Sequence, residues 1–240
     1  MMKFSWLRDF GRHTLSSLDA VLQQGRWSFA LLLISLVAVW HVYVPIHELL
    51  HVAGCVLTGG TVNELALQPQ YGARLLQHVF PFVVVDEGGA YAGRLTGFAT
   101  PNRWSHAVVD LFPYLPSVLG VTLLELARRH RSALLFSAGF VLAYVPWISL
   151  TGDFYELASL FTAPLAPILV PHGTADHFIS DDMFRLLSEM NTRGQLTAGG
   201  ISLVAFTLAL ALGVVVALTA LQWWVAQRYG SFVAGPSAHA

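Results

Sequence analysis

The sequence predicts an all-α polytopic membrane protein with about four transmembrane helices, and three observations lead to this prediction. Of its 240 residues, 55% are hydrophobic and only 11% are charged, whereas a typical water-soluble domain has about 25% charged residues. The mean hydropathy is +0.59. Several apolar stretches are long enough to cross a hydrocarbon core about 30 Å thick.

The N-terminal residues 1–26 are expected to lie on the membrane surface. Lys3, Arg8 and other basic residues alternate there with leucine and phenylalanine at spacings of three and four, which is typical of an amphipathic interfacial helix. We expect this segment to be followed by a membrane-embedded core over residues 27–227 and by a short C-terminal tail over residues 228–240.

The apolar stretches predict four spans within this core. They are residues 28–58, 105–127, 132–150 and 200–226. Pro45 is expected to bend the first span, and the pair Gly59 and Gly60 to end it. The apolar segment 157–171 is interrupted by prolines and leaves open a fifth span or a re-entrant half-helix.

Charged residues predict the orientation in the membrane. The RRHR cluster at residues 128–131 is the densest positive cluster in the chain. The positive-inside rule places it, and the arginine-bearing N-terminus, in the cytoplasm. Four spans satisfy both assignments and leave residues 59–104 and 151–199 on the outer face. Short apolar runs broken by proline and glycine in the first of these loops predict turns and short strands.

The most specific motif is His-Glu-Leu-Leu-His at residues 47–51. On a helix, His47 and His51 lie one turn apart on one face, so both imidazoles can bind one metal ion. Glu48 follows the first of them and can act as a general base. Zn²⁺ is the expected ion, because imidazole and carboxylate ligands with one open position form catalytic zinc sites. Ionisable residues within a span are costly, which also favours a functional role.

HELLH in a hydrophobic helix, followed by LTGGTVNELALQP, resembles the site-2-protease or M50 family of intramembrane zinc metalloproteases over residues 44–68. The resemblance implies a core of transmembrane helices and an aspartate on a later helix as the third zinc ligand. It also implies hydrolysis of peptide bonds in membrane-protein substrates within the lipid bilayer. Strand-like residues 61–68 would hold the unwound substrate by edge pairing.

Asp153 is the expected third ligand. It ends a predicted span at a depth similar to that of HELLH, although Gly152 and Asp153 reverse the Asp-Gly order of the family. Asp110, at a similar depth in the second span, and Glu156, the ligand type of water-soluble HExxH proteases, remain alternatives. His106 lies four residues before Asp110, and we expect a hydrogen bond between the two rather than a second metal.

Two other functions are consistent with these residues. One is a membrane-embedded zinc hydrolase acting on a lipid or a small amide, and the other is a non-catalytic scaffold, against which the intact Glu48 argues. The net charge of −1 gives no reason to expect a nucleic-acid partner, and the single cysteine, Cys55, excludes an intramolecular disulfide. Without a recognisable regulatory domain, we expect regulation through the loops or through membrane partner proteins.

Overall fold

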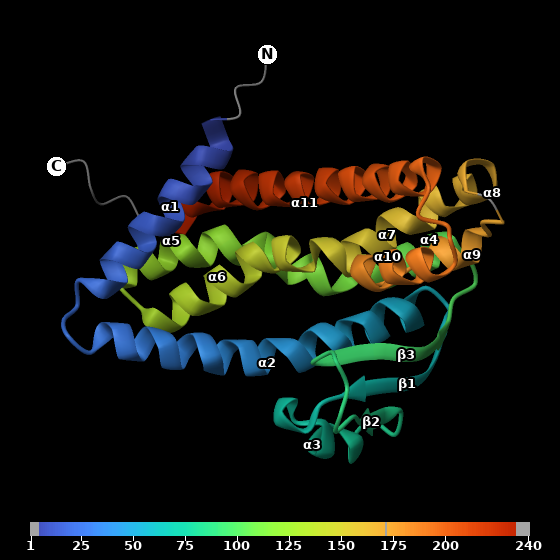
Figure 1. The fold of residues 1–240 in the computed structure, drawn as a ribbon. Helices are drawn as coiled ribbons and strands as arrows, with labels where there is room; N and C mark the ends of the chain where they lie inside the picture. Colours follow the sequence, from blue (N-terminus) through green and yellow to red (C-terminus); the bar gives the residue numbers. More distant parts are fainter. Residues whose placement is uncertain (1–4, 171, 234–240) are drawn as a thin grey trace. The chain divides into compact units, whose positions relative to one another are not determined.

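The computed structural model describes residues 5–170 and 172–233, which form helices and one small sheet (Figure 1). The helices are α1 (Ser5–Leu22), α2 (Ser28–Leu57), α3 (Ala73–Gln77), α4 (Arg103–Leu111), α5 (Gly120–His130), α6 (Ala133–Ile148), α7 (Asp153–Thr162), α8 (Ala166–Leu169), α9 (Ala175–Phe178), α10 (Met183–Thr192) and α11 (Ala198–Val233). The strands are β1 (Thr61–Leu67), β2 (Val83–Val85) and β3 (Gly93–Ala99). Turns of 3-10 helix cover Pro69–Tyr71, Phe112–Leu119, Ser149–Thr151 and Ala163–Leu165.

Four helical segments in the described part of the chain are long and apolar enough to cross a membrane. They are Ser28–Leu57, Arg103–His130, Ala133–Thr151 and Ala198–Tyr229. Their ends differ from those of the predicted spans by at most three residues. The helical fold with four span-capable segments, and strands after the HELLH helix, is therefore confirmed.

The possible fifth span and the expected C-terminal tail differ from the structure in their helix boundaries. Over its described residues 157–170, the segment considered as a fifth span is divided between the ten-residue α7, a 3-10 turn and the four-residue α8. Neither helix is long enough to cross a membrane. The expected tail 228–240 is described only through Val233, and those residues continue α11. Residues 1–4 of the N-terminal segment and 234–240 of the tail lie outside the described residues.

The chain divides into two compact units. The first consists of residues 1–44, 114–145 and 217–240. Within it, the amphipathic helix predicted near the N-terminus is present as α1, and its apolar side chains Phe10 and Val21 are buried in a cluster with residues of α5. One apolar side of α1 is thus packed within the protein, whereas Leu7 and Leu15 on the same helix are exposed.

The second unit consists of residues 45–113 and 146–216. It contains the sheet, α3, α4 and the helices α7 to α10, and its own core joins α7 to α11 through Tyr155, Met190 and Leu203. The chain crosses from one unit to the other at Val44/Pro45, Pro113/Tyr114, Val145/Pro146 and Val216/Ala217. Three of the four therefore coincide with a proline inside or at the start of a helical turn.

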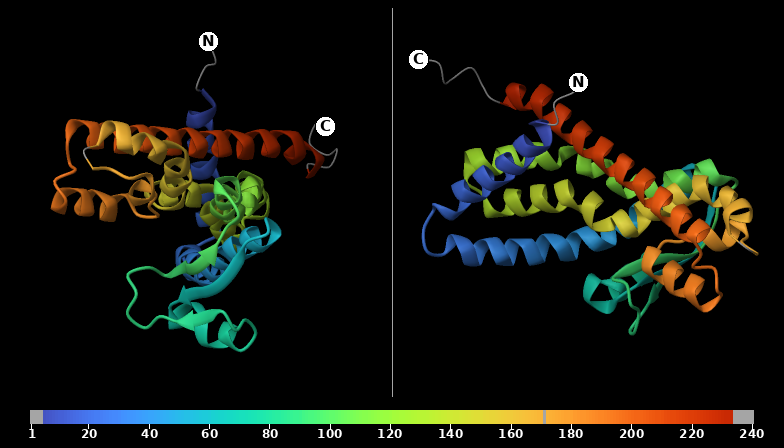
Figure 2. Two further views of the ribbon diagram at one scale, coloured as in Figure 1. Left: turned by 90° about the vertical axis from the view of Figure 1, so that its right-hand side faces the viewer. Right: turned by 45° about the horizontal axis from the view of Figure 1, so that its top comes forward.

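The sheet of the second unit has the strand order β2-β1-β3. β1 pairs with β2 in parallel and with β3 antiparallel, and α3 lies beside the sheet in each view (Figures 1 and 2). The predicted strand over residues 61–68 is confirmed as β1. Its segment Leu65–Leu67 is paired on both sides, so these three residues have no free edge for the pairing with a substrate that was expected over residues 61–68. The edge strands of the sheet are β2 and β3.

A close approach of two helices brings α4 against the HELLH helix. A Cβ atom added at Gly54 of α2 would lie 2.9 Å from the Cβ of Phe112 and 3.1 Å from the carbonyl oxygen of Val108. Glycine is therefore required at this contact, because any side chain would push the backbone of α4 away from α2.

We predict that Gly54→Ala destabilises the protein by about 1–3 kcal/mol, because the added methyl group overpacks this contact. Gly213→Ala is the matched control, since Gly213 is also helical but has open space around it. That substitution should leave the stability unchanged or raise it by up to about 1 kcal/mol through helix propensity. Thermal unfolding in detergent measures both variants, and changes of the same sign would contradict the prediction.

Candidate metal centre

The histidines of the HELLH motif face one point inside the second unit. They lie one helical turn apart on α2, so their imidazole rings project from the same face. The Nε2 atom of His47 is 3.2 Å from the Nε2 atom of His51. Both side chains and that of Glu48 are buried. Helical spacing alone thus brings two nitrogen ligands together in a space with little access to water.

The third group at this point comes from α7. Asp153 is the first residue of that helix, and its Oδ2 atom lies 3.1 Å from the Nε2 atom of His47 and 3.5 Å from that of His51. The carboxylate is partly buried, with its side chain 24% exposed. The structure therefore brings the expected third ligand to the two histidines.

The three atoms are spaced as ligands of a single ion. With ligand bonds of about 2.1 Å, a tetrahedral metal ion separates its ligand atoms by about 3.4 Å. The observed separations of 3.1, 3.2 and 3.5 Å match this value. Two imidazoles and one carboxylate are also donors that divalent transition metals accept. His47, His51 and Asp153 can accordingly hold a metal ion.

A backbone carbonyl of α4 orients one of the histidines. The Nδ1 atom of His51 donates a hydrogen bond of 2.9 Å to the carbonyl oxygen of Val109. This bond places the proton on Nδ1 and leaves the lone pair of Nε2 directed at the shared point. The close approach of α4 at Gly54 makes the bond possible, because it brings the backbone of α4 within reach of the ring.

The carboxylate of Glu48 is held beside the same point. A Cβ atom added at Gly93, the first residue of β3, would lie 2.5 Å from the Cγ atom and 2.8 Å from the Cδ atom of Glu48. The strand therefore passes directly over the glutamate, and only a glycine leaves room for it. Glu48 and Gly93 both line a cavity of roughly 160 Å³, which is large enough for several water molecules.

Negative charge dominates the lining of this cavity. Five carboxylates line it, and they are Glu48, Asp110, Asp153, Glu156 and Asp181. Arg94 of β3 is the arginine among the described residues of the lining. A cavity with this balance of charge attracts cations and repels anions.

The arginines at the rim of the cavity are paired with one carboxylate. The Nε atom of Arg94 lies 2.5 Å from Asp181, and the Nη2 atom of Arg185 lies 3.1 Å from it. Burial raises the pKa of Asp181, and the nearby Glu156 raises it further, while both arginines lower it. The two guanidinium groups thus form ion pairs with Asp181. Most of the negative charge of the cavity remains uncompensated.

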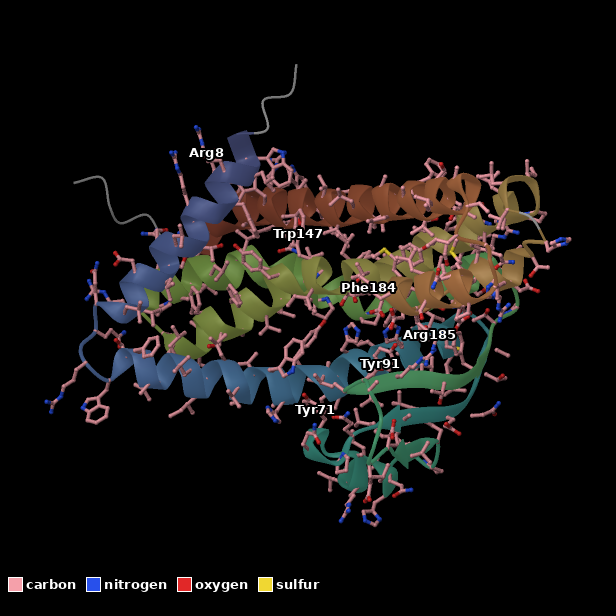
Figure 3. The ribbon with its side chains drawn as sticks, in the orientation of Figure 1. Arg8, Tyr71, Tyr91, Trp147, Phe184 and Arg185 are labelled. Carbon is pink, nitrogen blue, oxygen red and sulfur yellow. The ribbon has the colours of Figure 1, made fainter. Side chains whose placement is uncertain are left out.

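The rim also joins the loop before β3 to the start of α10. Tyr91 donates a hydrogen bond to the side chain of Asp182, and this hydrogen bond raises the pKa of the tyrosine. Asp182 in turn caps α10 by accepting from the backbone N–H groups of Phe184 and Arg185. Tyr91 and Arg185 lie close together in Figure 3. These contacts hold two distant parts of the chain at one edge of the cavity.

The two alternative ligands lie elsewhere in the cavity. Asp110 and Glu156 group with His106 rather than with the HELLH histidines. The Nε2 atom of His106 is 3.8 Å from Asp110, which is too long for the expected hydrogen bond. Cys55 is fully buried against the carbonyl oxygens of Thr61 and Ala99, which agrees with a packing role.

Sequence reasoning did not identify the groups that line the far side of the cavity. Arg94 and Asp181 belong to different predicted loops, and neither stands in a recognisable motif. The carbonyl group of Val109 has no signal in a sequence, because every residue carries one.

A scan against protein-family models, a search of curated proteins and a search of solved structures each found no match. The likeness of residues 44–68 to the site-2 proteases therefore stands as an expectation from the sequence. The distances among His47, His51 and Asp153 are the basis for assigning a metal site to the cavity.

We predict that Asp153→Asn removes one equivalent of tightly bound metal. Loss of a group that merely orients a ligand weakens metal binding about 10–100-fold, so loss of a ligand should weaken it by more than about 100-fold. Asp176→Asn, at an exposed carboxylate of α9, is the control and should change nothing. Competition with a chelator measures both affinities, and equal values for the two variants would refute the assignment of Asp153.

Proposed function

We propose that this protein is a multi-pass membrane zinc metallopeptidase that hydrolyses peptide bonds of membrane-protein substrates. The convergence of His47, His51 and Asp153 beside Glu48, at the wall of an acidic cavity, carries the proposal. Three protein ligands with a fourth position open are the arrangement of catalytic rather than structural zinc sites. The resemblance over residues 44–68 supplies the reaction class.

Each side chain then has a definite role. His47, His51 and Asp153 would hold the zinc ion, which would supply Lewis acidity to polarise a carbonyl group and to activate water. The carboxylate of Glu48 takes up a proton and passes it to the leaving amine. Gly93 keeps this carboxylate in place, and Val109 keeps the ring of His51 directed at the site.

The free edge of β3 is the proposed binding surface for an unwound substrate. Leu65 of β1 donates its N–H to Phe82 on the β2 side. Backbone groups alternate sides along a strand, so Ala66 faces its partner Arg94 on β3. Leu95, the next residue, then directs its N–H to the unpaired edge. Because Leu95 also lines the cavity, a chain paired at this edge would pass along the site.

A topology with four spans supports entry of water into the cavity from one face of the membrane. The ion pair between Arg94 and Asp181 joins residues 59–104 to residues 151–199, so both loops belong on the same side of the membrane. Two spans between the loops satisfy this condition, whereas a further full span over residues 157–171 would separate them. With the N-terminus in the cytoplasm, the cavity opens toward the outer face and water enters from there.

We predict that Glu48→Gln retains zinc but lowers cleavage of single-span membrane proteins by about 10²–10⁴-fold, because the general base is lost. Glu87→Gln, at an exposed loop carboxylate, should keep full activity. Zinc analysis and product gels on the purified proteins measure the two quantities. If wild type cleaves lipids or small amides but no protein substrate, and Glu48→Gln abolishes that activity, the peptidase assignment fails in favour of the lipid or amide hydrolase.

A second prediction concerns the substrate edge. Leu95→Pro removes the N–H that points away from β1, and should lower cleavage at least about tenfold while zinc content is retained. Leu95→Ala keeps the N–H and is the matched control for loss of the side chain. Equal cleavage by the proline and alanine variants would count against pairing at the edge of β3.

A further inference from the structure

A second group of potential ligands lies in the same unit as the HELLH site. His106 and Asp110 stand four residues apart on α4, the spacing that His47 and His51 have on α2. Glu156 joins them from α7, one turn after Asp153. Helix α7 thus directs one carboxylate to each group. Asp110 and Glu156 also line the cavity that contains Glu48 and Asp153.

The two separations that involve His106 fit one ion. The Nε2 atom of His106 is 3.2 Å from the Oε1 atom of Glu156 and 3.8 Å from the Oδ1 atom of Asp110. All three ligand atoms lie within 4.8 Å of one another. An ion with bonds of about 2.1 Å separates its ligands by about 3.0–4.2 Å, from adjacent to opposite positions.

Two buried polar atoms of the group lack a hydrogen-bond partner among the described residues. Asp110 is only 4% exposed, and its Oδ2 atom makes no hydrogen bond. The Nε2 atom of His106 is also buried and makes none, although Glu156 lies beside it. Buried carboxylates and imidazoles are normally satisfied. A cation bound by the group would satisfy atoms of this kind.

The nearby positive charges are committed to other partners. Arg94 and Arg185 both pair with Asp181, so neither guanidinium neutralises Asp110 or Glu156 in the structure. The ring of Phe98 meets His106 edge to face, with centroids 5.1 Å apart, and this contact fixes the orientation of the imidazole. The group is therefore positioned by packing and remains short of positive charge.

We propose that His106, Asp110 and Glu156 form a second binding site for a divalent transition-metal cation. One imidazole and two carboxylates make a more oxygen-rich donor set than that of the HELLH site, and this set suits Mn²⁺ as well as Zn²⁺. The ion joins α4 to α7. These helices supply the carbonyl group of Val109 and the carboxylate of Asp153 to the first site, so the second ion stabilises the frame of the first.

Metal stoichiometry of the full chain in detergent tests this proposal. The protein is stripped with a chelator, reloaded with Zn²⁺ or Mn²⁺ alone, freed of excess metal and analysed by mass spectrometry. Wild type should bind two equivalents, Glu156→Gln one, and Asp153→Asn one. The double variant should bind none, and Asp176→Asn should still bind two. Circular dichroism and thermal unfolding confirm that each variant is folded.

Titration of Mn²⁺ into metal-free Asp153→Asn, followed by electron paramagnetic resonance, tests the second site alone, and the same titration into metal-free Glu156→Gln tests the HELLH site alone. A bound Mn²⁺ signal in Asp153→Asn that disappears when Asp110→Asn is added to that variant supports the second site. One equivalent in wild type, unchanged in Glu156→Gln and in Asp110→Asn, would overturn the proposal and indicate that protons satisfy the carboxylates. Neither result depends on peptide cleavage, so a failure of the proposed hydrolase function leaves the test intact.

Discussion

The need to compensate buried charge governs the second unit of this protein. The side chains of His47, His51 and Asp153 meet at one point, where both histidines are buried and Asp153 is partly buried. Burying two imidazole nitrogens beside a carboxylate costs free energy unless a cation or protons compensate these groups. Close packing at a few positions maintains the arrangement. Gly54 allows the close approach of α4, and Gly93 leaves room for the side chain of Glu48. The first turn of α7 carries Asp153.

Features that depend on local periodicity could be predicted from the sequence. The four apolar helices, the strand after Gly60 and the shared face of His47 and His51 all follow from spacing along a short stretch of chain. Asp153 was reached differently, through the family resemblance and the expected depth of a span end. The structure places it at the histidines, while Asp110 and Glu156 lie in a separate group.

Features that depend on distant parts of the chain could not be predicted. The order of the strands places β1 in the centre and makes β2 and β3 the edge strands, and nothing within residues 61–68 encodes that order. The pairing of Arg94 with Asp181 joins two loops that the sequence separates by two spans. Phe10 and Val21 of α1 pack in a cluster with residues of α5, while Leu7 and Leu15 stay exposed. An amphipathic pattern alone does not tell which apolar side chains pack against protein.

The prolines at the passages between the two units give the long helices an uneven stiffness. A proline has no N–H group and leaves the carbonyl four residues earlier without its usual helical partner. At Pro45, Pro113 and Pro146, three helical segments lack that bond where the chain leaves one unit for the other. Bending there breaks fewer hydrogen bonds than bending elsewhere. The helical hydrogen-bond ladder is therefore interrupted at three places, and one of them, Pro45, lies two residues before His47.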